Sequence, residues 1–160
     1  MRYFLLSFLL FSISLNSFSQ LYPDLDMYCS DIQKELDASS SEVRFFTPYE
    51  EPIYFKKLVS NGKEAYIMTI NVIGPAENTG KGVIVNLGRN YTIKKEDVVT
   101  QVYQNEEGQY VHYASFTLTK DDISKLKNYI IKNYQVYMYS SGDASNNVKY
   151  QGYMYCLTKK

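Results

Sequence analysis

The dipeptide Asn61-Gly62 lies between two runs of alternating residues and constrains the fold of this chain more than any other feature. Asn-Gly is the preferred central pair of a type I′ turn, because both positions need a positive φ, and this turn joins antiparallel strands. The flanking runs, 53–59 and 64–73, are rich in strand-forming residues. One face of the second run is apolar, since Tyr66, Met68, Ile70 and Val72 alternate with Ile67, Thr69 and Asn71. The sequence therefore predicts a β-hairpin with one face turned toward a core.

Other short runs between turn residues predict further strands, and one segment has helical spacing. The predicted strands are 43–46, 82–87, 91–93, 98–104, 109–117, 134–139 and 148–156, with a helical turn or two over 32–36. The helix begins after Thr119, whose side-chain oxygen can accept free backbone N–H groups, and apolar residues follow at helical spacing. We therefore expect a mostly β fold, an antiparallel sandwich or barrel-like sheet of about seven strands with one short helix near 120–131.

The first 19 residues have the features of a secretory signal peptide. A basic Arg2 precedes the apolar run 4–15, and Ser17-Phe18-Ser19 is a small-x-small cleavage site. The apolar run is shorter than the roughly 20 residues that a transmembrane helix needs. We therefore expect an exported protein, periplasmic or extracellular, with no transmembrane span. After the signal, an irregular segment (20–51) is expected to pack on a single β domain (52–160).

Export makes the two cysteines, Cys29 and Cys156, readable as a disulfide. They lie at opposite ends of the expected mature chain, so a bridge would tie the irregular N-terminal segment to the last predicted strand. The alternative is two separate buried thiols. We predict the disulfide bridge.

Composition and motif spacing argue against several functional classes. The chain has 17 Lys plus Arg and 17 Asp plus Glu, so no basic excess favours nucleic acid. Two Cys and one His cannot build the usual structural zinc sites within one chain. The segment 74–82 lacks phosphate-loop spacing, because Gly82 follows Lys81 where Ser or Thr is needed. The acidic cluster in 24–37 does not match an EF-hand loop. We expect no metal and no cofactor, and His112 as a half-buried or exposed strand residue.

Three segments carry a resemblance to known proteins: Gly82-Val-Ile-Val, Leu118-Thr-Lys-Asp-Asp-Ile and Cys156-Leu157. With them the chain resembles a group of small exported bacterial β-domain proteins, and the resemblance covers most of the expected mature chain. The shared motifs are structural. The resemblance implies the β fold, but it implies no activity and no functional residues, because the group has no assigned activity.

Tyrosine is the one marked excess, with 17 residues in the chain. Strict alternation in the last two predicted strands places Tyr137 and Tyr139 on one face, with Tyr153 and Tyr155 on the neighbouring strand. Exposed tyrosine rings with polar rims can hold a protein or a glycan, which predicts a non-enzymatic binding or interaction domain. Alternatively, these rings face a second layer or only stabilise the sheet. A small exported hydrolase acting on envelope or glycan substrates and a structural envelope protein are the competing functions. The sequence does not indicate the oligomeric state.

Overall fold

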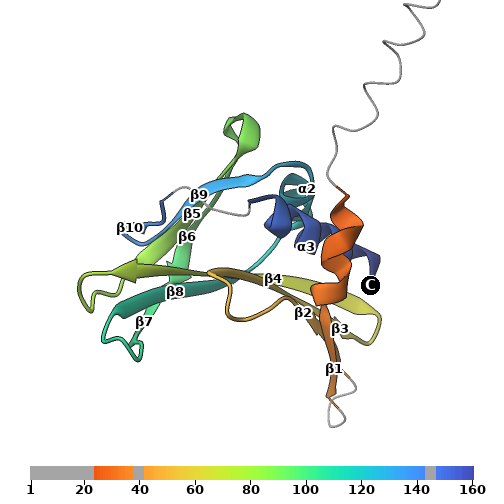
Figure 1. Cartoon of the computed structure of the whole chain (residues 1–160), viewed down its shortest axis with the longest axis horizontal. Helices are drawn as coiled ribbons and strands as arrows, with labels where there is room; N and C mark the ends of the chain where they lie inside the picture. The colour runs from red at the N-terminus through yellow and green to blue at the C-terminus, as the bar shows by residue number, and fades with distance from the viewer. Residues whose placement is uncertain (1–23, 38–41, 143–146) are drawn as a thin grey trace, which may run out of the picture.

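The computed structural model describes residues 24–37, 42–142 and 147–160 and contains two antiparallel sheets (Figure 1). The six-stranded sheet has the order β1 (Gln33–Asp37), β2 (Glu42–Phe46), β3 (Ile53–Ser60), β4 (Lys63–Gly74), β8 (Tyr110–Thr117) and β7 (Gln101–Gln104). The four-stranded sheet has the order β10 (Tyr139–Ser140), β9 (Ile131–Val136), β5 (Lys81–Leu87) and β6 (Thr92–Val99). The helical elements are η1 (Leu25–Asp31), η2 (Gly88–Asn90), α2 (Lys120–Asn128) and α3 (Asn147–Lys159).

The mostly β fold is confirmed, with ten strands in the described residues where about seven were expected. The two sheets remain open and form no closed barrel. Figure 1 shows η1, α2 and α3 on the same side of the six-stranded sheet as the four-stranded sheet. No helix in the described part of the chain is long and apolar enough to cross a membrane. The predicted signal peptide, residues 1–19, lies outside the described residues.

The Asn61-Gly62 turn is confirmed, with φ values of 50° and 72°. It pairs Ser60 with Lys63 and thereby fixes the register of β3 against β4, in which Tyr54 lies opposite Thr69. A one-residue shift would turn every side chain of β4 to the other face. The turn therefore decides which residues of these two strands enter the core.

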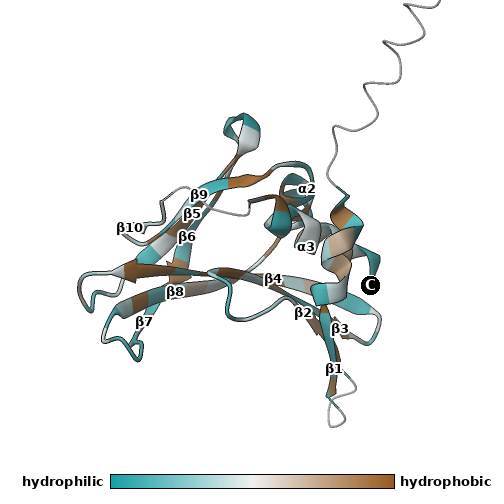
Figure 2. Cartoon of the chain, viewed as in Figure 1, coloured by the Kyte–Doolittle hydropathy of each residue, from teal (hydrophilic) through white to brown (hydrophobic). Residues whose placement is uncertain are grey.

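The core lies between the sheets and beneath α2 and α3. Figure 2 shows hydrophobic and hydrophilic bands alternating along the strands, as expected when one face of each sheet is buried. The six-stranded sheet contributes Ile53, Phe55, Met68, Ile70, Val72, Ala114 and Phe116, and the four-stranded sheet contributes Val83, Val85, Leu87, Ile93, Ile131, Tyr134 and Val136. Alternation places Tyr54, Thr69, Asn71 and Tyr113 on the outer face of the six-stranded sheet.

Helix α2 is held at its N-terminus by a capping box. The Thr119 side chain accepts a hydrogen bond from the Asp122 backbone N–H, and the Asp122 carboxylate accepts one from the Thr119 N–H. The same carboxylate lies 2.6 Å from Lys95 Nζ on β6. Burial acts to raise the pKa of Asp122, but the bonds from Lys95 and Thr119 outweigh it and the pKa lies below its usual value.

The predicted final strand, 148–156, is wrong, because this segment is helix α3. Tyrosine and valine favoured the strand interpretation. However, the buried residues recur at helical spacing, with Tyr150, Tyr153, Met154 and Leu157 all at most 3% exposed. These four side chains form one stripe that packs on the core, and packing outweighed the local strand propensity.

The Cys29–Cys156 disulfide is confirmed and joins η1 to α3 across 127 residues of sequence. The neighbouring contacts are close, because the Tyr28 ring lies where a Cβ on Gly152 would be. Tyr28 also packs edge-on against Tyr153, with ring centroids 6.0 Å apart. The bridge therefore fastens the described N-terminal segment to the last helix rather than to a strand.

The segment 20–51, expected to be irregular, contains η1, β1 and β2 in its described part. The helical turn predicted over 32–36 is wrong, because strand β1 occupies most of that range. Its predicted strand, 43–46, is confirmed within β2. Strands β1 and β2 extend the same sheet as β3, so this segment belongs to the β fold.

The strand predicted over 98–104 is divided between the two sheets at Thr100. Residues before it belong to β6 and residues after it to β7. Thr100 is buried, and its backbone N–H donates to the Gly80 carbonyl at 2.9 Å. The Gly80 N–H in turn donates to the Thr100 side-chain oxygen at 3.0 Å. Two of the three chain segments that pass between the sheets, those from β4 to β5 and from β6 to β7, are thus bonded to each other.

Candidate functional site

The four tyrosines predicted to share one face do not lie together. Tyr153 and Tyr155 are on helix α3, whereas Tyr137 lies in the tight turn after β9 and Tyr139 is the first residue of β10. Tyr153 is fully buried, and burial together with the Asp31 carboxylate raises its pKa. Tyr155 is half-buried beneath Lys159, whose Nζ lies 4.1 Å from the ring centroid. The prediction that these four tyrosines line neighbouring strands is therefore wrong, because it required a strand over 148–156 and this segment is helix α3.

Tyr137 and Tyr139 are engaged in packing at one end of the sandwich. Tyr137 has a φ of 55°, and its ring lies against Gly80. The Tyr139 ring lies 4.2 Å from that of His112, and its hydroxyl accepts a hydrogen bond from Asn78 Nδ2 at 3.0 Å. Both rings are half-buried. They hold the loop between β4 and β5 against the β9–β10 turn.

His112 is fully buried, which corrects the expectation of a half-buried or exposed residue. It lies on the inner face of β8 between Val72 of β4 and Val102 of β7. Gly74 allows this placement, because a Cβ there would lie 2.7 Å from His112 Nε2. Neither ring nitrogen has a hydrogen-bond partner among the described residues. His112 therefore fills the core and is not accessible to a ligand.

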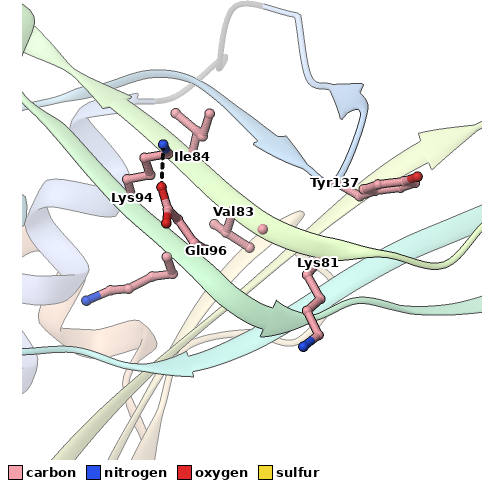
Figure 3. A pocket seen from close by; sticks show the side chains of 8 residues that line it. Lys81, Val83, Ile84, Lys94, Glu96 and Tyr137 are labelled. Carbon is pink, nitrogen blue, oxygen red and sulfur yellow. Dashed lines mark ion pairs between the residues drawn. The ribbon is translucent and has the colours of Figure 1, made fainter.

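A hollow on the outer side of the four-stranded sheet contains three lysines but does not gather them (Figure 3). Lys94 is paired with Glu96 at 2.6 Å, and the Lys95 ammonium is paired with Asp122. In Figure 3, Lys81 and Tyr137 extend away from the Lys94–Glu96 pair. Since these side chains diverge and two of the lysines already have carboxylate partners, the hollow is not built for an anion.

A second groove lies on the outer face of the six-stranded sheet, and we call it the tyrosine groove. Its volume is about 250 Å³, and it is lined by Tyr49, Tyr54, Thr69, Asn71, Tyr103 and Tyr113. Strands β3, β4, β8 and β7 supply five of these residues. Tyr49 comes from the loop between β2 and β3. The face opposite to the core thus carries its own aromatic cluster.

Two tyrosine pairs form the sides of the groove. Tyr49 meets Tyr54 edge-to-face with ring centroids 5.0 Å apart, and Tyr103 meets Tyr113 in the same manner at 5.8 Å. Edge-to-face contact is a preferred arrangement of aromatic rings and holds each pair in place. Tyr49 and Tyr103 are 47% and 50% exposed. Each side therefore has one supporting ring and one ring open to a ligand.

The floor of the groove is polar and is set by the strand registers. Thr69 lies opposite Tyr54 across β3 and β4, and Asn71 lies opposite Tyr113 across β4 and β8. The Thr69 hydroxyl is 2.7 Å from the Ser115 hydroxyl, so the floor continues to the neighbouring strand as a hydrogen-bonded pair. Thr69 itself is buried, so the half-buried Asn71 amide is the polar group that the floor presents between the two aromatic sides.

No lining residue of the groove carries a formal charge at neutral pH. Burial raises the pKa of Tyr49, with smaller contributions from Tyr54 and Glu35, so this phenol stays protonated well above neutral pH. The lining offers hydrogen-bond donors and acceptors and flat apolar surfaces. It contains no carboxylate or imidazole for general acid–base catalysis. Chemically, the arrangement is suited to holding an uncharged, polar ligand.

Part of the groove could have been found from the sequence. The Asn61-Gly62 turn by itself places Tyr54 opposite Thr69, and alternation places both on the face away from Met68. Strands β7 and β8 form a local hairpin, but the contribution of Tyr113 and Tyr103 depends on the pairing of β8 with β4, which joins distant residues. Tyr49 lies in a loop, for which periodicity gives no position. No local signal joins these residues.

Comparison with known proteins does not assign the groove. No family model, no curated protein and no solved structure matches this chain. Among the described residues, no group of three or more His, Cys, Asp or Glu side chains is placed to hold a metal ion. The tyrosine groove is therefore the feature from which a function can be inferred.

Proposed function

We propose that this protein is an exported, non-enzymatic binding domain that holds a neutral glycan in the tyrosine groove. The observation that carries the proposal is the pairing of two open tyrosine rings, Tyr49 and Tyr103, across a floor of Thr69 and Asn71. Flat apolar surfaces beside a few fixed polar groups are the usual composition of a small-ligand site.

A saccharide fits this composition better than a charged ligand or a peptide. A sugar ring has a flat C–H face and a rim of hydroxyl groups, which match a tyrosine ring, the tyrosine hydroxyls and the Asn71 amide of the lining. The uncharged lining gives no ion pair to an anionic or cationic group, which would lose hydration on binding. The rings are also held in place by edge-to-face contacts before binding, which lowers the ordering cost.

Glycan binding is tested with a panel of soluble neutral and acidic polysaccharides, using affinity electrophoresis for screening and calorimetry for any positive glycan. Tyr103→Ala should weaken binding by about 30-fold, corresponding to the roughly 2 kcal/mol of an anchoring aromatic residue. The matched control is Tyr91→Ala, an exposed tyrosine that stacks on Tyr129 outside the groove and should not change binding. Equal affinities of the two variants, or no binding across the whole panel, would contradict the proposal.

Export is the second part of the proposal and has its own test. The disulfide between Cys29 and Cys156 supports it, because such bridges persist mainly in oxidising compartments. The intact mass of the protein recovered from its native location should correspond to a chain that begins at Gln20 or Leu21. A recovered chain that retains residues 1–19 would contradict signal cleavage.

A further inference from the structure

The four edges of the two sheets differ in how they are protected from pairing with another strand. Exposed edges are normally blunted by charged residues or by short length. Strand β1 has three charged residues, β6 has the charged run 94–97, and β10 has only two residues. Strand β7 has the sequence Gln101-Val102-Tyr103-Gln104, with no charge and no proline. Among the edges that the structure describes, β7 is the longest one that carries no charged residue.

The free side of β7 can be assigned from its hydrogen bonds. The Asn105 N–H donates to the Gln109 carbonyl at 2.9 Å, where β7 turns back into β8. Because hydrogen-bonded and non-bonded pairs alternate in an antiparallel ladder, the backbone groups of Val102 and Gln104 point away from β8. The side chains of Gln101, Tyr103 and Gln104 are exposed. The edge therefore offers both backbone groups and uncharged side chains to a partner strand.

We propose that β7 pairs antiparallel with β7 of a second copy of this chain. An uncharged edge can approach its own copy without like-charge repulsion and without taking charged side chains out of water. Because each copy has one such edge, pairing gives a closed two-fold dimer and not a growing fibre. The dimer would join the two six-stranded sheets into one continuous sheet.

The dimer would also extend the tyrosine groove. Tyr103 belongs both to the groove and to β7, so pairing brings the two copies of Tyr103 to the same edge on the same outer face. The two grooves then lie along one sheet and suit a linear glycan longer than one groove can hold. This last consequence rests on the proposed function, whereas the dimer itself does not.

The dimer is tested without any glycan, by sedimentation velocity of the mature chain up to about 1 mM, the weak end of specific association. A four-residue edge predicts a weak, concentration-dependent dimer. Two variants probe the edge, one with Gln101→Lys and Gln104→Lys and one with Gln101→Glu and Gln104→Glu. Each variant alone should associate about tenfold more weakly than the wild type, and high salt should lessen the effect.

Mixing the lysine and glutamate variants gives the decisive result. The mixture should form a heterodimer more readily than either variant alone, because opposite charges then face each other across the two β7 strands. The matched control is Gln33→Lys, an exposed glutamine on the charged edge strand β1, which should leave association unchanged. A chain that stays monomeric throughout, or a dimer that these variants do not alter, would overturn the proposal. A monomer that still binds glycan would overturn the dimer alone and leave the proposed function standing.

Discussion

Reduction of the Cys29–Cys156 disulfide is expected to cost a large part of the stability of this protein. The bridge closes a loop of 127 residues, nearly the whole described chain. In the chain-entropy relation, a loop of this length constrains the unfolded state by about 5 kcal/mol at 25 °C. Small domains are stable by only about 5–15 kcal/mol in total. The reduced protein should therefore be marginally stable or unfolded.

The assay is urea unfolding followed by circular dichroism, with and without a phosphine reductant. Cys29→Ala is the matched variant, because Cys29 is the more exposed partner and its loss leaves buried Cys156 in place. Cys29→Ala should unfold at the same urea concentration as the reduced wild type, and reductant should not shift it further. This agreement would separate loss of the bridge from side effects of the reductant.

If reduction lowers the free energy of unfolding by less than about 2 kcal/mol, the reasoning is refuted, because that loss lies under the usual range for a native disulfide. It would mean that η1 separates from α3 before the rest of the chain unfolds. In that case the Tyr28–Tyr153 contact would not couple η1 to the core. Hydrogen exchange of the η1 amides in the reduced protein distinguishes this local opening from global unfolding.

Three further predictions concern buried side chains. Tyr153→Ala should cost about 3–5 kcal/mol in urea unfolding, as for other buried aromatic residues, whereas half-buried Tyr155→Ala should cost less than half as much. Because the pKa of Asp122 is lowered in the folded state, its stabilisation should be complete above its unfolded pKa of about 3.9 and should be lost as the pH falls through the folded value. Asp122→Ala should remove that part of the acid dependence of unfolding. Burial raises the pKa of Tyr134 to about 12, so stability should fall as the pH rises from about 10 through this value. Tyr134→Phe should remove the part of this loss that ionisation of Tyr134 causes. Absorbance of the tyrosinate form gives a second measurement of the same titration.

The features that the sequence predicted correctly are mostly local. The turn at Asn61-Gly62 needs two positive φ values that these residues tolerate, and the Thr119 cap needs only residues within one helical turn. The Cys29–Cys156 bridge joins distant residues, but it was predictable because only one intramolecular pair was possible. In each of these cases the sequence left few alternatives.

The failures arise where packing decides between two local readings. The segment 148–156 contains strand-forming residues in alternation, yet Tyr150, Tyr153 and Leu157 bury one helical stripe. The tyrosine groove joins Tyr54 to Tyr113 through pairings between strands that are far apart in sequence. A tyrosine-rich surface is therefore present, but it lies on the outer face of a sheet and is formed by tyrosines other than the four predicted ones.

The bonded crossing at Thr100 and Gly80 bears on how the molecule loses its structure. The connections from β4 to β5 and from β6 to β7 both pass through this point, and each donates a backbone N–H to the other. These bonds couple the two sheets at this point, which disfavours a species with one intact sheet and one melted sheet. The amides of Thr100 and Gly80 should accordingly exchange with deuterium only through whole-molecule unfolding, and the protein should behave as one cooperative unit with a single transition.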